Sequence, residues 1–590
     1  MRDYFETVKN FSAADLERRT LAGSLSDGVN ACIECCDRWA KNGAIALEWY
    51  GTNGERRTLT FKEMRDNAGR FANYLQSQGI GRGDVVAGLL PRVPDLFTVI
   101  LGAWRIGAMY QPLFTAFGPA AIESRVTAAG GSKAKVVVTD VANRPKLMDV
   151  PDCPDILTVG DGFAEAIEPH STDFAPVMLK GSDPFVMLFT SGTTGKPKGV
   201  RYPLTLLLPV ASYMLDAIDL RPDDNYWNVA DPGWAYGMLY AVVGPLMLGH
   251  ATTFHEGAFT VESTARIIAD RKITNLAAAP TAYRLLMAAG DEAMAPIAHL
   301  LRVASSAGEP LNPEVIRWAD RVLHCPLADH YGQTEVAMMI NNHHALKHPV
   351  KPGSAGLPMP GFELAILDDD LNVQPANTSG VLAVNIARSP MYTFTGYWKA
   401  ETPNIRSGWY ITGDTMMRDE DNHFSFVGRN DDIITSSGYR IGPFDVESVV
   451  MEHPAVAEVA VIGKPDPQRT EIVKAVIVLR PGVEGTEDLK SEIQQMVRQR
   501  LSTHAYPREI DSSQRCRRRR AARSSVSFCA ASARNGEMSN VRFGLRPEVM
   551  AGISHVRSGQ KASVRRGSPR VRPRVDSGHH APFWVRRKLL

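Results

Sequence analysis

The 590-residue sequence is poor in cysteine and contains no long apolar run. Its seven cysteines do not form a disulfide framework, and Cys32, Cys35 and Cys36 have no second Cys/His pair at zinc-binding spacing. We therefore predict buried or idle thiols. No stretch approaches the roughly 18 apolar residues of a membrane-spanning helix, and no apolar segment of a signal peptide follows the charged start Met-Arg-Asp-Tyr-Phe-Glu. These absences predict a globular cytoplasmic protein without a membrane span.

The net charge is only +2, but the charges are unevenly distributed. Residues 511–590 contain 17 Arg, 2 Lys and four acidic residues, whereas residues 1–510 contain 47 Lys plus Arg and 60 Asp plus Glu. A reading-frame change near codon 510 predicts such an abrupt shift in composition. A natural basic tail that binds nucleic acid or anionic membrane non-specifically is the alternative. Either way we expect an Arg-rich, disordered tail.

Short apolar runs alternate with helical patterns before this boundary. Helical spacing occurs in Leu59–Gly79 and Leu96–Ile106. The runs expected to form buried strands are Asp84–Leu90, Val136–Thr139, Phe185–Phe189 and Ile273–Ala278. This alternation is typical of crossover units around parallel sheets and predicts an α/β fold.

A segment rich in glycine and threonine, Thr190-Ser-Gly-Thr-Thr-Gly-Lys-Pro-Lys-Gly199, follows one of these runs. Its glycines allow a tight turn with inward N–H groups, and its hydroxyl and ammonium groups add donors and charge. It lacks the first glycine of a Walker A loop, because position 190 is Thr. We predict a polyphosphate-binding loop between a strand end and a helix that starts after Pro203; a flexible surface loop is the alternative.

Five further short motifs follow the loop, and their order along the chain is informative. They are Ala230-Asp-Pro-Gly-Trp234, Gly308-Glu-Pro310, Asp329-His-Tyr-Gly-Gln-Thr-Glu335, Tyr410-Ile-Thr-Gly-Asp414 and Gly428-Arg-Asn-Asp-Asp-Ile-Ile-Thr-Ser-Ser-Gly-Tyr-Arg440. With the loop, they make residues 20–510 resemble AMP-forming acyl-CoA synthetases of the acyl-adenylate-forming superfamily. Acetyl-CoA and medium-chain acyl-CoA synthetases and luciferases belong to this superfamily.

The resemblance implies a large N-terminal domain, residues 1–430, of two helix-flanked sheets plus a small β-barrel. A hinge at Asp431 then leads into a small α/β domain, residues 431–510, and the tail 511–590 follows. Within the small domain the patterns predict a helix, two strands and a helix at Asp445–His453, Val456–Ile462, Ile472–Leu479 and Glu487–Leu501.

The resemblance also implies a two-step reaction with ATP, Mg²⁺, a small carboxylic acid and coenzyme A. The β- and γ-phosphates are expected at Thr190, Ser191, Gly192, Thr193, Thr194, Gly195, Lys196 and Lys198. Glu335 matches the Mg²⁺ ligand, a hard oxygen donor, and Thr334 matches the donor to the α-phosphate. Asp414 and Arg429 match the ribose contacts, whereas Gly308, Glu309, Pro310 and Asp329 should border the adenine.

Two positions bear on the size of the acid. Trp234 matches a pocket-lining tryptophan of acetyl-CoA synthetases, but Gly332 stands where those enzymes carry a second tryptophan. The loss of an indole would open the pocket to acids longer than acetate, and a medium-chain fatty acid is the predicted substrate. A branched or aromatic acid stays open, and so does a purely structural role of Gly332 in close backbone packing.

Three positions belong to the thioester step or to domain rotation. Gly438 matches the glycine beside the pantetheine tunnel, and Arg440 matches an arginine tied to the adenylation conformation. Arg105 is a candidate for the 3′-phosphate of CoA.

The resemblance ends at Ile510. The family continues with a strand and a loop of the type Pro-x-x-x-x-Gly-Lys, whose lysine contacts the carboxylate and the α-phosphate. No Gly-Lys pair occurs after residue 510 in this chain. We therefore expect an incomplete small domain that lacks its last strand, an unpaired sheet edge and weak adenylation.

Other functions remain open from the sequence. One is a non-catalytic protein that binds a nucleotide or acyl-AMP and is recruited by its basic tail. Others are an acetyl- or propionyl-CoA synthetase and an adenylation domain that feeds a carrier protein, although no carrier domain follows.

Overall fold

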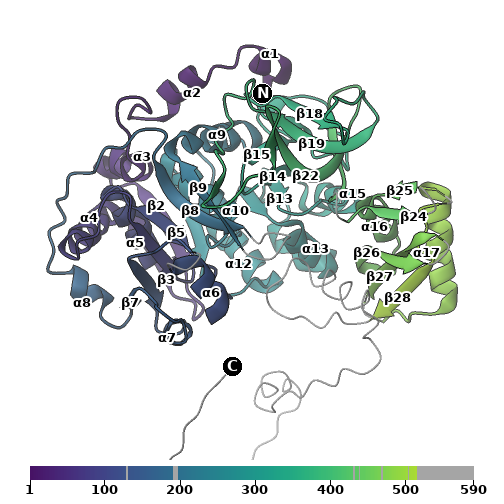
Figure 1. Ribbon diagram of the computed structural model, residues 1–590. Helices are drawn as coiled ribbons and strands as arrows, with labels where there is room; N and C mark the ends of the chain where they lie inside the picture. Colours follow the sequence, from purple (N-terminus) through teal and green to yellow (C-terminus); the bar gives the residue numbers. More distant parts are fainter. Residues whose placement is uncertain are drawn as a thin grey trace, which may run out of the picture. The chain divides into compact units, whose positions relative to one another are not determined.

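Two large sheets make up most of the chain before residue 430 in the computed structural model (Figure 1). The structure describes residues 1–127, 131–190, 197–429, 432–436, 439–466, 469–480, 482–502 and 504–513. The first sheet has the order β20 (Tyr397–Trp398), β9 (Lys198–Pro203), β8 (Pro184–Thr190), β5 (Met109–Pro112), β4 (Val85–Leu89), β6 (Val136–Asp140) and β7 (Asp155–Val159).

The second sheet carries the other half of this region. Its order is β17 (Leu357–Pro358), β15 (Ala337–Asn341), β14 (Leu327–Gln333), β13 (Val303–Ala307), β12 (Asn275–Ala278), β10 (Tyr226–Asn228), β11 (Thr252–His255), β2 (Ile45–Tyr50) and β3 (Arg56–Thr60). Strands β12, β13 and β14 are parallel, so their carboxyl ends meet at one edge. Binding sites of open α/β sheets lie at such edges.

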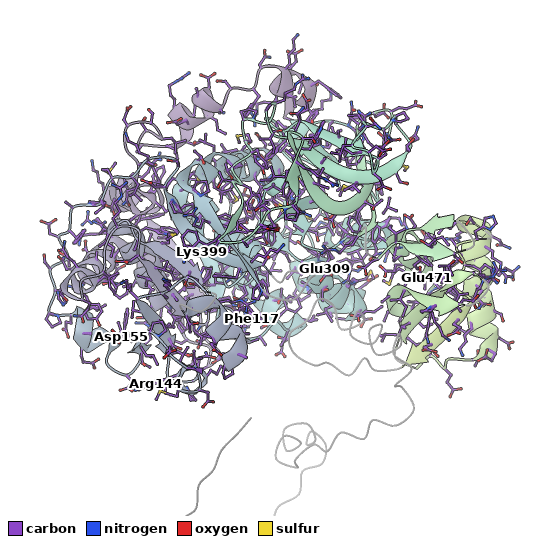
Figure 2. All side chains as sticks on the ribbon, viewed as in Figure 1. Phe117, Arg144, Asp155, Glu309, Lys399 and Glu471 are labelled. Carbon is purple, nitrogen blue, oxygen red and sulfur yellow. The ribbon has the colours of Figure 1, made fainter. Side chains whose placement is uncertain are left out.

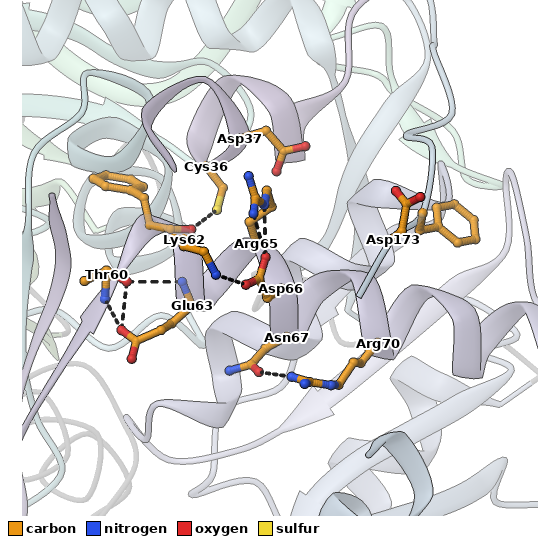
Figure 3. A network of polar contacts seen from close by, with 12 residues as sticks. Cys36, Asp37, Thr60, Lys62, Glu63, Arg65, Asp66, Asn67, Arg70 and Asp173 are labelled. Carbon is orange, nitrogen blue, oxygen red and sulfur yellow. Dashed lines mark hydrogen bonds and ion pairs between the residues drawn. The ribbon is translucent and has the colours of Figure 1, made fainter. Parts of the chain in front are cut away.

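Helices alternate with these strands, as the sequence predicted. The longer ones before residue 430 are α2 (Ala13–Thr20), α4 (Phe61–Ser77), α5 (Asp95–Arg105), α6 (Pro119–Val126), α12 (Val261–Arg271) and α13 (Pro280–Ala288). Helix α4 begins with a reciprocal cap, because Thr60 Oγ1 accepts from Glu63 N while Thr60 N donates to the Glu63 carboxylate (Figure 3). Its predicted apolar face is buried against α5, so the periodicity is confirmed.

The phosphate-loop segment lies in a different setting from the one expected. Strands β8 and β9 are antiparallel neighbours, with Thr190 opposite Lys198. The helical region after Pro203, made of a 3₁₀ turn (Leu204–Leu206) and α9 (Leu207–Ser212), starts only after β9. The predicted helix after Pro203 is therefore confirmed, but a strand that was not predicted, Lys198–Pro203, lies between the glycine- and threonine-rich segment and that helix.

The predicted buried thiols are confirmed within the described part of the chain. Cys32 and Cys35 lie in α3 (Ala31–Cys35), and both are buried together with Cys36. Burial raises the pKa of the Cys32 thiol to about 12, which disfavours the reactive thiolate.

A third, antiparallel sheet follows in the chain. It is formed by β18 (Leu364–Leu367), β19 (Ser379–Asn385), β22 (Trp409–Arg418), β21 (Ile405–Arg406) and β23 (Phe424–Arg429). The register pairs Asp414 of β22 with Arg429 of β23. The sheet therefore brings two predicted ribose contacts opposite each other on adjacent strands.

The predicted helix, strand, strand and helix of the small domain are confirmed as α16 (Pro443–Met451), β26 (Val456–Asp466), β27 (Thr470–Leu479) and α17 (Glu487–Arg500). Strands β24 (Ile434–Ser436) and β25 (Tyr439–Ile441) extend the same sheet.

The last strand of this sheet corrects an expectation. Strand β28 (Glu509–Ser513) pairs in parallel with β27, from Lys474 opposite Glu509 to Val478 opposite Ser513. Ile510 is buried and belongs to the apolar core of this sheet. The edge expected to be unpaired is therefore covered, because the strand begins before the composition changes and continues three residues beyond Ile510. The tail after Ser513 lies outside the described residues.

Candidate active site

The hairpin of β8 and β9 places two of the predicted phosphate contacts. Thr190 ends β8 and Lys198 begins β9. The Lys198 ammonium lies 4.8 Å from the ring centroid of Tyr397, which β20 brings alongside β9. A cation can be held over an aromatic face at this distance. The other predicted contacts of the loop, Ser191, Gly192, Thr193, Thr194, Gly195 and Lys196, lie outside the described residues.

Glu335 occupies the turn between β14 and β15. Its Oε1 accepts a hydrogen bond of 2.8 Å from the Tyr397 hydroxyl. Burial raises the pKa of the Glu335 carboxyl, and the bond from Tyr397 opposes that shift. Glu335 is thus a half-buried oxygen donor that could meet a cation brought in with a substrate.

The described residues contain no group of three or more His, Cys, Asp and Glu side chains that could hold a metal ion. Mg²⁺ typically takes one or two protein carboxylates and completes its shell with substrate phosphates and water. A single half-buried glutamate near the β8–β9 hairpin fits that pattern.

Two buried tyrosines hold the turn that carries Thr334. Tyr202 donates to the Thr334 carbonyl over 2.6 Å, and the Tyr240 hydroxyl accepts from Met338 N over 3.1 Å. Ala337 has φ +61°, a conformation that side-chain-bearing residues rarely adopt. The hydrogen bonds on both sides of the turn stabilise this backbone, as is common at functional sites.

Asp414 lies in a polar network between β14 and β22. Its Oδ2 accepts from the Tyr331 hydroxyl over 2.5 Å and from Gln333 Nε2 over 2.7 Å. Arg429 Nε lies 4.0 Å from Oδ1. Asp414 is buried, and hydrogen bonds to a carboxylate favour its charged form. The structure therefore brings together two predicted ribose contacts and the 329–335 segment.

The predicted adenine segment follows β13, next to the end of β14. Gly308 has φ +98°, which a side chain would disfavour. Glu309, labelled in Figure 2, accepts from Arg284 over 2.7 Å and from Thr281, and Pro310 follows it before α15 (Pro313–Trp318). The neighbouring Asp329 is buried, and Oδ1 of its carboxyl has no hydrogen-bond partner among the described residues. Burial raises the pKa of this carboxyl well above its usual range.

Trp234 is 39% exposed, although it is a large apolar side chain. Its ring centroid lies 5.3 Å from that of Phe114 and 5.8 Å from that of Phe117, which is labelled in Figure 2. The three rings form an accessible aromatic cluster, and such a surface suits an apolar ligand.

Gly332 has a backbone role that the sequence left as an alternative. A Cβ at this position would lie 2.1 Å from the Ala337 carbonyl oxygen. The register of β14 and β15 shifts between Tyr331 and Gly332, so the two strands approach closely there. Close backbone packing therefore requires glycine, whatever its effect on the pocket.

Arg105 does not lie where a CoA phosphate could reach it. Its side chain is 4% exposed, and its guanidinium is ion-paired with Asp37 and donates to the Phe174 carbonyl over 2.9 Å. These contacts tie α5 to the core and contradict the predicted role, because a phosphate needs an accessible guanidinium.

The structure describes little of the positions that were linked to the thioester step and domain rotation. Asp431 and Gly438 lie outside the described residues, and so does the side chain of Arg440. The backbone of Arg440 belongs to β25, where it pairs with Thr435.

Sequence reasoning missed Tyr397, Gln333, Tyr331 and Tyr410. Gln333 and Tyr331 lie inside the recognised 329–335 stretch, so the pattern contained a signal for them. Tyr397 contacts Glu335 across 62 residues, and only the fold creates that contact.

Comparison with known proteins agrees with this geometry. The sequence model of the AMP-binding enzyme family matches residues 36–398, and that of the AMP-binding enzyme C-terminal domain matches residues 445–520. The chain therefore belongs to the AMP-binding enzyme family. Within it, the relatives described next place the chain among the AMP-forming acyl-CoA synthetases, which are acid–thiol ligases that use ATP and CoA.

Acetyl-coenzyme A synthetase of Bacillus subtilis (strain 168) is 38% identical over 530 residues, covering 87% of this chain and 91% of the relative. Acetyl-coenzyme A synthetase of Shewanella oneidensis is 34% identical over 523 residues, covering 81% and 80%. The crystal structure of Brucella canis acyl-CoA synthetase has a TM-score of 0.75 and 52% identity, covering 91% of this chain and 100% of that one. No helix among the described residues is long and apolar enough to cross a membrane.

Proposed function

We propose that this enzyme activates a carboxylic acid larger than acetate, with a medium-chain fatty acid as the preferred substrate. An oxygen of the acid attacks the α-phosphorus of ATP, the bond to the β-phosphate breaks, and pyrophosphate leaves. The CoA sulfur then attacks the acyl carbon, and AMP leaves with the electron pair of the acyl–oxygen bond. The observation that supports the adenylation reaction is that three groups lie around the carboxyl end of β14. Asp414 contacts Gln333 there. Tyr397 contacts both Glu335, just after this strand, and Lys198 of the β8–β9 hairpin.

Each residue has a role in positioning or in charge stabilisation. Lys198 and the loop from Thr190 hold the phosphates, Thr334 donates to the α-phosphate, and Asp414 with Arg429 holds the ribose. Glu335 would hold Mg²⁺, which when bound neutralises phosphate charge. Asp329 and the segment Gly308–Pro310 border the adenine.

The acid is selected by the aromatic cluster around Trp234. No indole closes the pocket at position 332, and each additional buried methylene stabilises the bound acid by about 0.8 kcal/mol, or roughly fourfold in affinity. We expect kcat/KM to rise from acetate towards six- to eight-carbon acids in a series of straight-chain acids. A maximum at acetate or propionate would contradict this preference and favour the alternative suggested by the names of the relatives.

The chain as it stands is proposed to be weak in the adenylation half-reaction. It lacks the Gly-Lys loop, and loss of one positioned cationic donor costs about 10²- to 10³-fold in rate. Thioester formation from supplied acyl-AMP is expected to survive, since β28 completes the described sheet of the small domain.

Pyrophosphate exchange and thioester formation measured separately test this. The control is a variant whose residues after Ile510 are replaced by a family-type ending with the lysine loop, which should regain exchange. Equal exchange in both chains would show that the lysine is dispensable. Nucleotide binding without either half-reaction in the restored chain would favour a non-catalytic binding protein.

A further inference from the structure

Two uncharged side chains, Gln333 and Tyr410, form a chain of hydrogen bonds that ends at the buried Asp414 carboxylate. Gln333 Nε2 donates to Asp414 Oδ2 over 2.7 Å and to the Thr412 carbonyl over 3.1 Å. The Tyr410 hydroxyl donates to Gln333 Oε1 over 2.9 Å. Tyr410 is fully buried, so its ring cannot move aside without opening the core.

This arrangement determines the orientation of the Gln333 amide. Both groups near Nε2 are pure acceptors, a carboxylate and a carbonyl, so only the NH₂ end can face them. Rotation of the amide by 180° would set its oxygen against the Asp414 carboxylate. The Tyr410 hydroxyl contributes the matching donor at the other end. The amide is therefore locked from both sides.

The locked amide in turn restricts the carboxylate. Asp414 Oδ2 accepts from two donors, Gln333 and the Tyr331 hydroxyl, which come from the same strand, β14. A carboxylate held by such bonds keeps one rotamer and its charge. A carboxylate whose direction is already set binds two ribose hydroxyls together more tightly, because no side-chain freedom is lost on binding.

We propose that Gln333 and Tyr410 are positioning residues that orient Asp414 and thereby set the preference for a ribonucleotide over a deoxyribonucleotide. The inference rests on the proposed role of Asp414 as the ribose acceptor. It assigns nucleotide-sugar selection to two side chains that act through the Asp414 carboxylate.

The test compares Gln333→Met, which keeps the length of the side chain but removes its hydrogen bonds, with Tyr410→Phe. The matched control is Tyr392→Phe. The ring centroid of Tyr392 lies 6.0 Å from that of Tyr410, and its hydroxyl is buried without a hydrogen-bond partner among the described residues. Dissociation constants of full-length protein for ATP, 2′-deoxy-ATP and 3′-deoxy-ATP are measured by calorimetry, so the readout does not need turnover.

We expect Gln333→Met to weaken ATP binding about 10- to 100-fold, the usual size of a hydrogen bond to a charged group. Binding of the deoxynucleotides should weaken much less, so the preference for ATP falls towards one. Tyr410→Phe should shift the preference in the same direction by a smaller factor, and Tyr392→Phe should leave it unchanged.

A uniform loss for all three nucleotides in Gln333→Met would indicate a merely structural role and would overturn the inference. The inference is also overturned if Gln333→Met and Tyr410→Phe both keep the preference for ATP while Asp414→Asn abolishes it. In that case the proposed role of Asp414 would still stand. If the unaltered protein binds all three nucleotides equally, the ribose role of Asp414 fails together with the inference.

Discussion

Single residues at this site combine a proposed chemical role with a backbone requirement. Gly332 is the clearest case, because both the predicted opening of the pocket and close backbone packing call for glycine there. The contact with Ala337 means that a bulky substitution changes the β14–β15 turn before it changes the pocket. Gly332→Trp is therefore no clean test of acid size.

Gly332→Ala is expected to destabilise the protein by about 1–3 kcal/mol, the usual cost of forcing a methyl group into a closely packed site. The midpoint of urea unfolding measures this change. Gly81→Ala is the control, because a Cβ there meets no atom within 4 Å. Equal midpoints for the two variants would contradict the packing role.

At the scale of elements, β28 decides whether the small sheet has a stable edge. Lys474 of β27 is 9% exposed, and its ammonium lies 2.9 Å from Asp511 Oδ2 and 3.4 Å from Glu509 Oε2. Both carboxylates belong to β28. The strand thus contributes counter-charges as well as backbone hydrogen bonds.

Asp511→Asn combined with Glu509→Gln is expected to destabilise this sheet by about 1–3 kcal/mol, because a mostly buried ammonium loses its partners. This expected loss of stability is smaller than the loss for a fully buried ion pair, because both carboxylates are partly exposed. Amide hydrogen exchange along β27 is the measurement. Glu487→Gln, at an exposed ion pair with Lys490, should change nothing. Unchanged exchange in the double variant would show that backbone pairing alone holds the edge.

At the scale of the whole molecule, buried histidines predict sensitivity to acid. Burial lowers the pKa of His344 to about 4, although its ring is 2.9 Å from the Ala304 carbonyl. The pKa values of His330 and His343 are lowered for the same reason. An unfolded histidine titrates near pH 6.5, so acid protonates the unfolded chain first.

The stability that His344 contributes is therefore fully present above about pH 6.5 and is lost as the pH falls towards 4, by about 3 kcal/mol. We expect the free energy of unfolding, measured with urea from pH 7.5 to 4, to fall less steeply in His344→Gln. The slope should differ by at most about 1.4 kcal/mol per pH unit. Identical slopes would show that the pKa of His344 is the same in the folded and the unfolded chain.

The sequence alone determined the α/β class, most helices and strands, and the identity of the main polar groups, because periodicity and short motifs are local. It also identified Asp414 and Glu335 through the order of their motifs. It missed strand β9 between the glycine- and threonine-rich segment and the following helix, because either a strand or a helix can follow such a segment. The sequence also did not predict strand β28, because its residues show no strong apolar alternation.

Only the tertiary structure decided which groups meet. The contacts of Tyr397 with Glu335, of Gln333 and Tyr331 with Asp414, and of Arg105 with Asp37 join segments 62 to 83 residues apart in the chain. Such contacts depend on strand order and register, which arise from the packing of whole sheets. The sequence therefore indicated the chemistry of the site, whereas the fold determined how that chemistry is oriented.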